Sequence, residues 1–514
     1  MTDRLQELAG RRRKTMAGGG EKRVERQHAL GKWTARERVD ALFDPGTFVE
    51  LDLFTTHRST LFGMDRAESP ADGVVTGYGA VEGRLVYAYA QDFTVLGGSL
   101  GEMHAGKIHK VQDLALKSGA PIVGIADSGG ARIQEGIDAL NGYGEIFRRN
   151  TLASGVVPQI SVIVGPAAGG AVYSPAITDF VLMAEGIGQM YITGPQVIES
   201  VTGEKVSHEE LGGAHTHARR SGNAHLTFAT EQELFAGLRR LLRFLPSNNL
   251  ASPPQAEPKD PLEGSAERLR GVVPEDANKP YDVRDVIQGL VDQGDFLELQ
   301  PEFARNLVIG FGRVEGHAVA IIGNQPKVLA GCLDIDASDK LARFVRFADA
   351  FSIPVITFVD TPGYLPGTKQ EYGGIIRHGA KVLYAYSEAT VPKVSVVLRK
   401  AYGGAYLAMC SRSLGADAVL AFPTAEVAVM GPDGAANIIF RGEIEGAEDP
   451  VAERKRLVET YRAEFASPYV AAAHGYVDQV IDPAELRPAV ARTLWALRQK
   501  REERPAKKHG NIPL

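Results

Sequence analysis

The chain alternates short apolar runs with longer amphipathic stretches, the pattern of strands and helices in an α/β protein. Apolar, β-branched runs predict strands at residues 85–90, 121–126, 159–164 and 180–183, and again at 318–323, 354–359, 393–398 and 418–422. Helical spacing of apolar positions predicts helices over residues 103–116 and 338–350. Because helices separate the strands, we expect largely parallel pairing. Residues 2–42 are expected to form a charged, solvated helical arm.

The second half of the chain repeats the first. Apolar runs beginning at Val157 and Val391 (391 − 157 = 234) each lead into the sequence Gly-Gly-Ala. Four further blocks recur in order, at offsets from 233 to 248 residues; they start at Asp44 and Asp292, Gly77 and Gly310, Pro121 and Pro354, and Gly194 and Gly431. The fall from 248 to 233 predicts a 15-residue insertion in the first half (248 − 233 = 15), around residues 55–70. These repeats predict a tandem duplication.

Length and charge narrow the class of protein. A chain of 514 residues exceeds one ordinary core, and the repeat predicts domains 1–250 and 266–514, joined by a linker at 251–265 within the proline-rich, exposed stretch 246–261. A net charge of −6 argues against a nucleic-acid partner. Two cysteines exclude a disulfide framework and a zinc ribbon. The charged N-terminus and the interrupted apolar runs predict a cytoplasmic protein without direct membrane contact.

The duplicated glycine pairs are the first candidates for chemistry. Each pair lies between a predicted strand and a predicted helix, where amide hydrogens are unpaired and the helix dipole favours negative charge. Such amides suit an oxyanion, and two copies suggest a reaction with two oxyanions. The alternative interpretation is a tight turn that only packs each helix against its strand. The first turn contains Gly169 and Gly170, and the second contains Gly403, Gly404 and Ala405.

A second glycine-containing loop precedes each of these turns. Residues 128–132, which are Ser128, Gly129, Gly130, Ala131 and Arg132, form a small-residue loop suited to a phosphate or a thioester. Arg132 and Lys107 are either ligands of CoA phosphates or ordinary surface cations. Residues 360–367, with Gly363 and Tyr364, form a stiff loop that either shapes a flat pocket or is only a rigid turn. No metal site is expected, because the histidines at 208, 215, 217 and 225 lack acidic or cysteine ligands at a persuasive spacing.

Several of these motifs together resemble a known family. They are Asp127-Ser-Gly-Gly-Ala-Arg-Ile-Gln-Glu-Gly136, Gly165-Pro-Ala-Ala-Gly-Gly-Ala-Val-Tyr-Ser-Pro175, Gly373-Gly-Ile-Ile-Arg-His-Gly-Ala380, Arg399-Lys-Ala-Tyr-Gly-Gly-Ala-Tyr406 and Met430-Gly-Pro-Asp-Gly-Ala-Ala-Asn437. They are similar to the carboxyltransferase (β) subunits of biotin-dependent acyl-CoA carboxylases, including propionyl-CoA carboxylase β chains and the methylmalonyl-CoA transcarboxylase large subunit. The resemblance runs from about residue 23 to the C-terminus.

The resemblance implies a fold of two crotonase-like domains in tandem and a homo-hexamer. Acyl-CoA would bind the first domain and carboxybiotin, carried on a partner protein, the second domain of a neighbouring subunit. A biotin carboxylase and a biotin carrier would be the partners, and carboxyl would move to the α-carbon of propionyl-CoA, or of acetyl-CoA, through enolate intermediates.

The resemblance also implies a role for each candidate residue. Gly169 and Gly170 would hold the thioester enolate, and Gly404 and Ala405 the ureido oxygen of biotin. Residues 128–132, Tyr173 and Leu407 would bind substrate. Biotin would be bound by Gly363, Tyr364, Tyr402 and Gly403.

Leu407 departs from many propionyl-type members of the family, which carry aspartate at this position, and this puts strict propionyl preference in doubt. One methylene separates propionyl from acetyl by only about 1–3 kcal/mol.

Two other functions stay open at this point. The subunit of a sodium-pumping methylmalonyl-CoA decarboxylase would run the same chemistry in reverse, with membrane partners. An assembly scaffold without catalysis is the other, and both intact glycine turns argue against it.

Overall fold

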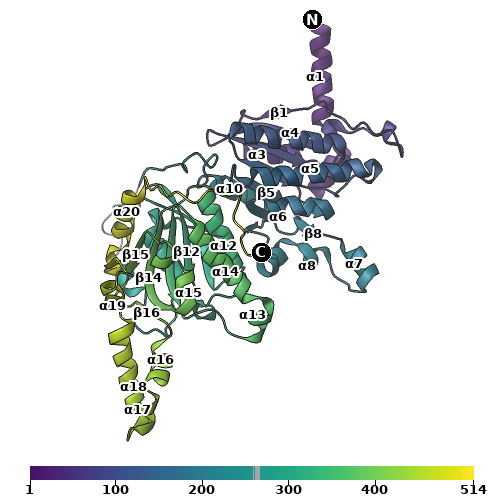
Figure 1. Ribbon diagram of the computed structural model, residues 1–514. Helices are drawn as coiled ribbons and strands as arrows, with labels where there is room; N and C mark the ends of the chain where they lie inside the picture. The colour runs from purple at the N-terminus through teal and green to yellow at the C-terminus, as the bar shows by residue number, and fades with distance from the viewer. Residues whose placement is uncertain (259, 261–266) are drawn as a thin grey trace. The chain divides into compact units, whose positions relative to one another are not determined.

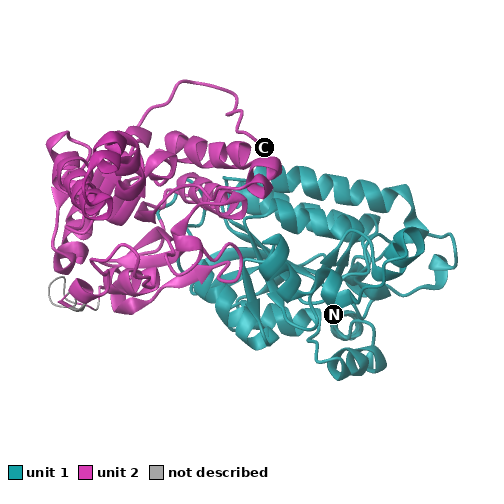
Figure 2. Ribbon diagram, turned by 90° about the horizontal axis from the view of Figure 1, so that it is seen from below, with its two compact units in different colours: residues 1–252 teal, residues 253–514 magenta. Residues whose placement is uncertain are grey.

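The computed structural model describes residues 1–258, 260 and 267–514, which divide into two compact units, residues 1–252 and 253–514 (Figure 2). Residues 259 and 261–265 of the expected linker lie outside the described residues. The stretch before it is not exposed throughout, because Pro246 is buried and the Asn248 side chain donates to the Gly119 carbonyl at 2.7 Å. The chain near residue 248 is therefore held by unit 1.

Unit 1 contains a seven-stranded sheet with the order β1-β2-β3-β4-β5-β7-β9. Its strands are β1 (Val49–Leu51), β2 (Val74–Val81), β3 (Arg84–Gln91), β4 (Ile122–Ala126), β5 (Gln159–Ile163), β7 (Phe180–Ala184) and β9 (Leu226–Phe228). The first three pair antiparallel, and from β3 onward each neighbour is parallel. Beyond β5, the short strand β6 (Pro166–Ala168) pairs with β8 (Gln189–Tyr191).

Unit 2 has the same sheet, built in its described residues from eight strands in the order β10-β11-β12-β13-β14-β15-β17, with β16 paired to β14. The strands are β10 (Leu297–Leu299), β11 (Leu307–Val314), β12 (His317–Asn324), β13 (Val355–Thr361), β14 (Lys393–Tyr402), β15 (Ala418–Ala421), β16 (Glu426–Ala428) and β17 (Gln479–Val480). Here β14 is one long strand where unit 1 has β5 and β6.

Helices cover the sheets and link their strands. In unit 1 they are α1 (Thr2–Met16), α2 (Glu21–Ala29), α3 (Ala35–Leu42), α4 (Glu102–Ser118), α5 (Ile137–Ala153), α6 (Tyr173–Ile177), α7 (Pro195–Thr202), α8 (His208–Gly212), α9 (Ala214–Thr216) and α10 (Glu231–Leu242). In unit 2 they are α11 (Val283–Leu290), α12 (Ile335–Ala350), α13 (Thr368–Gly373), α14 (Ile375–Glu388), α15 (Gly403–Ala408), α16 (Pro432–Ile439), α17 (Arg441–Gly446), α18 (Pro450–Tyr461), α19 (Pro468–Ala473) and α20 (Leu486–Leu497).

The duplication is visible in the strand registers. Ile122 of β4 pairs with Gln159 of β5, and their counterparts Val355 and Lys393 pair in β13 and β14. The predicted insertion is confirmed. Residues 52–73 separate β1 from β2, whereas residues 300–306 separate β10 from β11, a difference of 22 − 7 = 15 residues.

The eight predicted strands and both predicted helices are confirmed. Several strands were not predicted, and the longest of them in the described residues are β2 and β11, with eight residues each. Their glycines interrupt the apolar alternation that marks a strand. The structure gives the reason for one of them, since a Cβ on Gly77 would lie 2.2 Å from the carbonyl oxygen of Val49 on β1. The glycine that obscures the pattern therefore permits the close approach of the edge strand.

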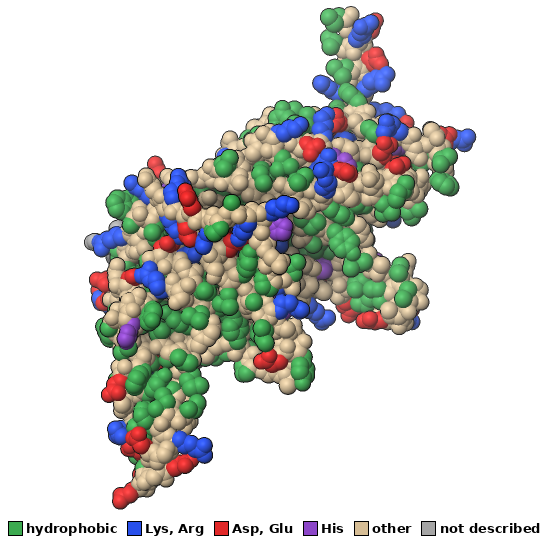
Figure 3. Space-filling model, viewed as in Figure 1, with side chains coloured by type: hydrophobic (Ala, Val, Ile, Leu, Met, Phe, Trp, Pro, Cys, Tyr) green, Lys and Arg blue, Asp and Glu red, His purple; other side chains and the backbone are tan. Residues whose placement is uncertain are grey.

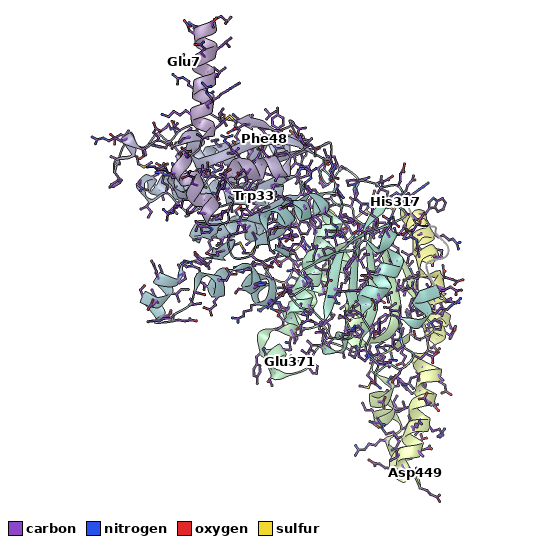
Figure 4. All side chains as sticks on the ribbon, turned by 180° about the vertical axis from the view of Figure 1, so that it is seen from behind. Glu7, Trp33, Phe48, His317, Glu371 and Asp449 are labelled. Atoms are coloured by element: carbon purple, nitrogen blue, oxygen red, sulfur yellow. The ribbon has the colours of Figure 1, made fainter. Side chains whose placement is uncertain are left out.

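Each unit carries a projecting helical segment. In unit 1, α1 has no buried residue, carries Glu7 and extends away from the sheet (Figures 1 and 4). In unit 2, α16–α18 form an arm that projects from the sheet, with Asp449 at its far end (Figures 1 and 4). Apolar side chains gather on this arm (Figure 3), including Ile438, Ile439 and Val451, which are 60–81% exposed.

Candidate functional site

The first glycine pair lies where β6 ends and a 3₁₀ turn begins, just before α6. Gly169 has φ +60°, a left-handed conformation that glycine adopts without a steric penalty. Its amide donates to the Ile192 carbonyl at 3.1 Å, so this N–H is already used in a hydrogen bond within unit 1. The next residue, Gly170, is half-buried in the first turn, where amides have no intrahelical acceptor. Of the predicted pair, Gly170 is the better-placed donor to a ligand.

The second glycine pair has the same backbone conformation, and its second glycine has more open surroundings than Gly170. Gly403 has φ +59° and begins α15, directly after β14. Gly404 is exposed, and a Cβ placed on it would meet no atom within 4 Å. Ala405 is buried, with its amide still in the first turn of the helix. The space beside Gly404 is therefore open, in contrast to the space beside Gly170, where a Cβ would lie 3.0 Å from the Tyr143 ring.

The Ser128 loop lies against the strand that leads into the first turn. The Ser128 amide donates to the Pro166 carbonyl at 2.8 Å, and the Gly130 amide donates to the Ser128 hydroxyl at 3.1 Å. A Cβ on Gly130 would lie 3.2 Å from the Ala168 carbonyl. Ala131 forms a bridge with Leu100 that fixes the other side of the loop. The structure therefore brings the two predicted glycine motifs of unit 1 together.

The equivalent loop of unit 2 lies at the same edge of its own sheet. Thr361 pairs with Ala401, two residues before Gly403, and Tyr364 bridges to Leu333 just as Ala131 bridges to Leu100. Burial raises the pKa of the Tyr364 phenol to about 12. Gly363 is half-buried beside it. In both units the candidate residues lie beyond the carboxyl ends of parallel strands, where ligands of open α/β sheets commonly bind.

Arg132 and Lys107 are not surface cations, so that interpretation is wrong for both. Each is only 2% exposed. Arg132 pairs with Asp72 at 2.8 Å and Glu135 at 2.7 Å. A guanidinium held between two carboxylates has little net charge left for a phosphate, so it is better suited to holding the loop than to binding CoA.

Lys107 and its counterpart Lys340 fill equivalent carbonyl cages. The ammonium of Lys107 donates to the carbonyls of Ala71 and Val74 at 2.8 and 2.5 Å. Lys340, 233 residues later, donates among others to the Leu307 carbonyl at 2.7 Å. Burial lowers the pKa of Lys107 to about 8 and that of Lys340 to about 7. Both lysines therefore support the chain that enters β2 and β11.

In each sheet a fully buried aspartate lies at an equivalent strand end, beside the glycine motifs. Asp127 accepts from Lys32 at 2.6 Å and from Arg38 at 2.8 Å. Asp360 accepts from Arg399 at 3.1 Å, and burial raises the pKa of its carboxyl against the opposing effect of that guanidinium. Sequence reasoning placed both aspartates at strand ends but missed these cations. The alignment of Arg399 with Gly165 (399 − 165 = 234) was the available signal.

Three other candidate residues flank the turns. Tyr173 and Leu407 are counterparts 234 residues apart and are 47% and 42% exposed, so both are accessible to a ligand. Tyr402 is buried, and its phenol donates to Glu426, which also accepts from Arg462 at 2.7 Å. Tyr402 therefore links the second turn to the base of the helical arm.

The histidines at 208 and 217 are engaged in hydrogen bonds within unit 1. His208 Nδ1 lies 2.8 Å from the Tyr191 hydroxyl, and His217 Nε2 lies 2.8 Å from the Met190 carbonyl. Across the described parts of the chain, no set of three His, Cys, Asp or Glu side chains is grouped for a metal ion. Within the same residues, no helix combines the length and apolar character that a membrane span requires.

Comparison with known proteins identifies the family. The protein-family model of the carboxyl transferase domain matches residues 26–512, almost the whole chain. The chain belongs to the carboxyl transferase family. The predicted activity class, carboxyl transfer by an enzyme, is confirmed, since curated relatives of this family match the chain over its full length.

Two relatives and one crystal structure illustrate the similarity. The propionyl-CoA carboxylase carboxyltransferase subunit of Haloferax mediterranei is 57% identical over 100% of both chains. The methylmalonyl-CoA decarboxylase subunit alpha of Veillonella parvula is 62% identical over 98% of this chain and 97% of its own. The transcarboxylase 12S crystal structure with methylmalonyl-coenzyme A and methylmalonic acid bound is 57% identical, with a TM-score of 0.98 over 100% of this chain and 98% of that one. This match confirms the predicted α/β fold of two crotonase-like domains.

Proposed function

We propose that this carboxyltransferase moves a carboxyl group between carboxybiotin and the α-carbon of a short acyl-CoA, with propionyl-CoA as the preferred acceptor. The observation that carries the proposal is the duplicated glycine turn, half-buried in unit 1 and open in unit 2. The names of the relatives, which include a propionyl-CoA carboxylase subunit, support the choice of acyl group. A biotin carboxylase and a biotin carrier would be the partners. The hexamer named for transcarboxylase 12S supports the same assembly here.

In unit 1, the Gly170 amide would donate to the thioester oxygen as negative charge develops on it. Such a donor is typically worth about 2.7–4 kcal/mol of barrier. The loop of residues 128–131 lies beside this turn and would receive the CoA thioester, while Arg132 holds the loop from inside. Tyr173, half-exposed on the next helix, would contact the substrate.

In unit 2, the amides of Gly404 and Ala405 would donate to the ureido oxygen of biotin. Two observations support biotin at this place. The space beside Gly404 is open, and the same edge of the sheet carries Gly363, Tyr364, Tyr402 and Gly403. When docked, carboxybiotin would supply the carboxyl group and a ureido nitrogen that accepts the α-proton. The chain's own task is then to orient both ligands and stabilise the two oxyanions.

The proposal is tested by mixing the purified chain with methylmalonyl-CoA and free biotin or biocytin and measuring decarboxylation. We expect turnover that Gly170→Val and Gly404→Val each reduce at least 100-fold while the fold is retained. Turnover at the unsubstituted rate in both variants would exclude the assigned turns.

Transfer in the opposite physiological direction, as in a methylmalonyl-CoA decarboxylase, is the second candidate, favoured by the 62% identity to the Veillonella parvula subunit. Affinity purification of the chain from its own cells distinguishes the two. Co-purification of a biotin carboxylase supports carboxylation, and co-purification of a multispan membrane protein supports decarboxylation.

Leu407 is proposed to set acyl selectivity from the second turn of α15, where it is 42% exposed. Rates with acetyl-, propionyl- and butyryl-CoA should shift in relative size by about 10-fold in Leu407→Asp, within the range that one pocket contact provides. Unchanged ratios would remove Leu407 from this role.

A further inference from the structure

Tyr143 of α5 lies directly behind the first glycine turn. A Cβ placed on Gly170 would lie 3.0 Å from Cδ2 and 3.1 Å from Cγ of the Tyr143 ring. The ring stacks on Phe147 with centroids 6.1 Å apart, and Phe147 meets Tyr173 edge-on at 6.0 Å. One aromatic wall therefore supports both Gly170 and the helix that follows it.

Tyr143 also lies near the other glycine loop of unit 1. Tyr143 is 4% exposed, its hydroxyl is buried without a hydrogen-bond partner among the described residues, and burial raises the pKa of its phenol. The hydroxyl is too enclosed to act on a bound ligand. The ring faces Gly170, and Ala131 of the Ser128 loop packs against the apolar cluster that contains Tyr143, so Tyr143 adjoins both motifs proposed to receive the thioester.

The packing behind the turn makes this contact important. A cavity of about 30 Å³, enough for one or two water molecules, is lined by Tyr143, Ala171, Ser174 and Tyr89 among others. Close packing normally holds a backbone segment in place. The cavity removes part of this packing from behind the turn. The contact between the Tyr143 ring and Gly170 therefore provides a larger share of the packing that holds the turn in place.

We propose that Tyr143 is a positioning residue that fixes the Gly170 amide relative to the Ser128 loop. This inference rests on the proposed function of the turn. Tyr143 acts through Gly170 and Ser128, so its loss should lower kcat for carboxyl transfer more than it changes KM for the acyl-CoA. The second turn is expected to lack this dependence, because Gly404 has open space where Gly170 has a ring.

The first experiment compares Tyr143→Phe and Tyr143→Leu with Tyr78→Leu, a matched control on β2 whose side chain packs in a separate apolar cluster. In the methylmalonyl-CoA and biotin assay, we expect kcat to fall about 3- to 10-fold in Tyr143→Phe and about 100-fold in Tyr143→Leu, with KM within 3-fold. Tyr78→Leu should keep kcat within 2-fold. Equal effects of the two Leu variants on kcat would overturn the proposal.

The second experiment is a size exchange. Gly170→Ala adds a methyl against the ring, so it should displace the turn, and Tyr143→Leu in the same chain should restore at least 10-fold of the lost activity. A double variant no more active than Gly170→Ala would contradict positioning through the ring.

Deuterium exchange over residues 165–175 provides a readout without turnover. Exchange should be faster in Tyr143→Leu than in Tyr78→Leu, and equal exchange would overturn the proposal. An unsubstituted chain that transfers no carboxyl, but shows this difference in exchange, would refute the proposed function and leave the contact between Tyr143 and the turn intact.

Discussion

Asp127 and Asp360 occupy equivalent positions in the two units, yet their cations come from different parts of the chain. In unit 2, Arg399 belongs to β14, the neighbouring strand of the same sheet. In unit 1, glycine occupies the corresponding position 165, where a Cβ would lie 1.9 Å from the Asp127 carboxylate. The charge there comes from Lys32 and Arg38, before the first strand. The two units therefore share the buried carboxylate, but the cations that pair with it come from different parts of the chain.

This difference means that the helical N-terminal segment has two separate roles. The prediction of a solvated arm over residues 2–42 is confirmed for α1, which has no buried residue, and is wrong for α3, which buries four residues. Arg38 in α3, by contrast, is fully buried and pairs with both Asp127 and Glu231, at 2.8 and 2.6 Å. The segment therefore completes the core beside the first glycine motifs, whereas unit 2 completes its own from within the sheet.

The largest expected effect is the removal of one buried cation. Arg38→Met and Arg399→Met should each lower the free energy of unfolding by about 3–5 kcal/mol. The first leaves Asp127 with Lys32 as its remaining cation and removes the guanidinium from Glu231, and the second removes the guanidinium from Asp360. Deuterium exchange should rise in β4 and β5 for the first variant, and in β13 and β14 for the second. Increased exchange spread equally over both sheets in either variant would contradict separate charge networks.

The next effect concerns the two caged lysines, Lys340 and Lys107, which should change the free energy of unfolding with pH in the same direction in both units. Their pKa values, lowered from 10.5 to about 7 for Lys340 and about 8 for Lys107, mean that the folded chain binds fewer protons than the unfolded chain between those values and 10.5. Stability should therefore rise with pH in that window, between pH 7 and 9 by about 2 kcal/mol from Lys340 and about 1 kcal/mol from Lys107.

Urea unfolding at pH 7, 8 and 9 measures this slope. Lys340→Met should remove more of it than Lys107→Met, whatever each substitution does to the absolute stability. A slope unchanged in both variants would show that the two ammonium groups stay charged in the folded state.

The smallest expected effect tests the identity of the two turns. Gly169 and Gly403 share φ values near +60°, so replacing either by alanine should cost about 1–2 kcal/mol of stability. Gly403→Ala should cost more than Gly169→Ala, because its Cβ would lie 3.0 Å from the Val429 carbonyl oxygen, whereas that of Gly169→Ala would lie 3.8 Å from the Ile192 carbonyl oxygen. Thermal unfolding of both variants measures these losses, and a loss in only one variant would contradict one backbone device in two copies.

Much of the fold can be predicted from the sequence, because the duplicated elements occur in both halves and each copy supports the prediction of the other. The repeat offsets predict the 15-residue insertion correctly, and the apolar runs predict the central strands of both sheets. The alternation of apolar residues does not predict β2 and β11, because their glycines, which allow an edge strand to approach closely, interrupt it.

Less of the site is predictable. The glycine turns and their companion loops are recognisable as motifs, and the structure brings them together within each unit. Long-range pairing cannot be read from local spacing, so Arg132 was mistaken for a possible surface cation, and Lys32, Arg38 and Tyr143 were missed. Only the mismatch between Gly165 and Arg399 in the aligned repeats indicated that the two charge networks differ.

The two turns are proposed to serve different ligands, and calorimetric binding of methylmalonyl-CoA in the absence of biotin distinguishes their roles. The assignment predicts that Gly404→Val binds methylmalonyl-CoA within 2-fold of the unsubstituted Kd, while Gly170→Val binds it at least 10-fold more weakly, although carboxyl transfer falls at least 100-fold in both. Equal weakening in both variants, or weakening in Gly404→Val alone, would contradict it.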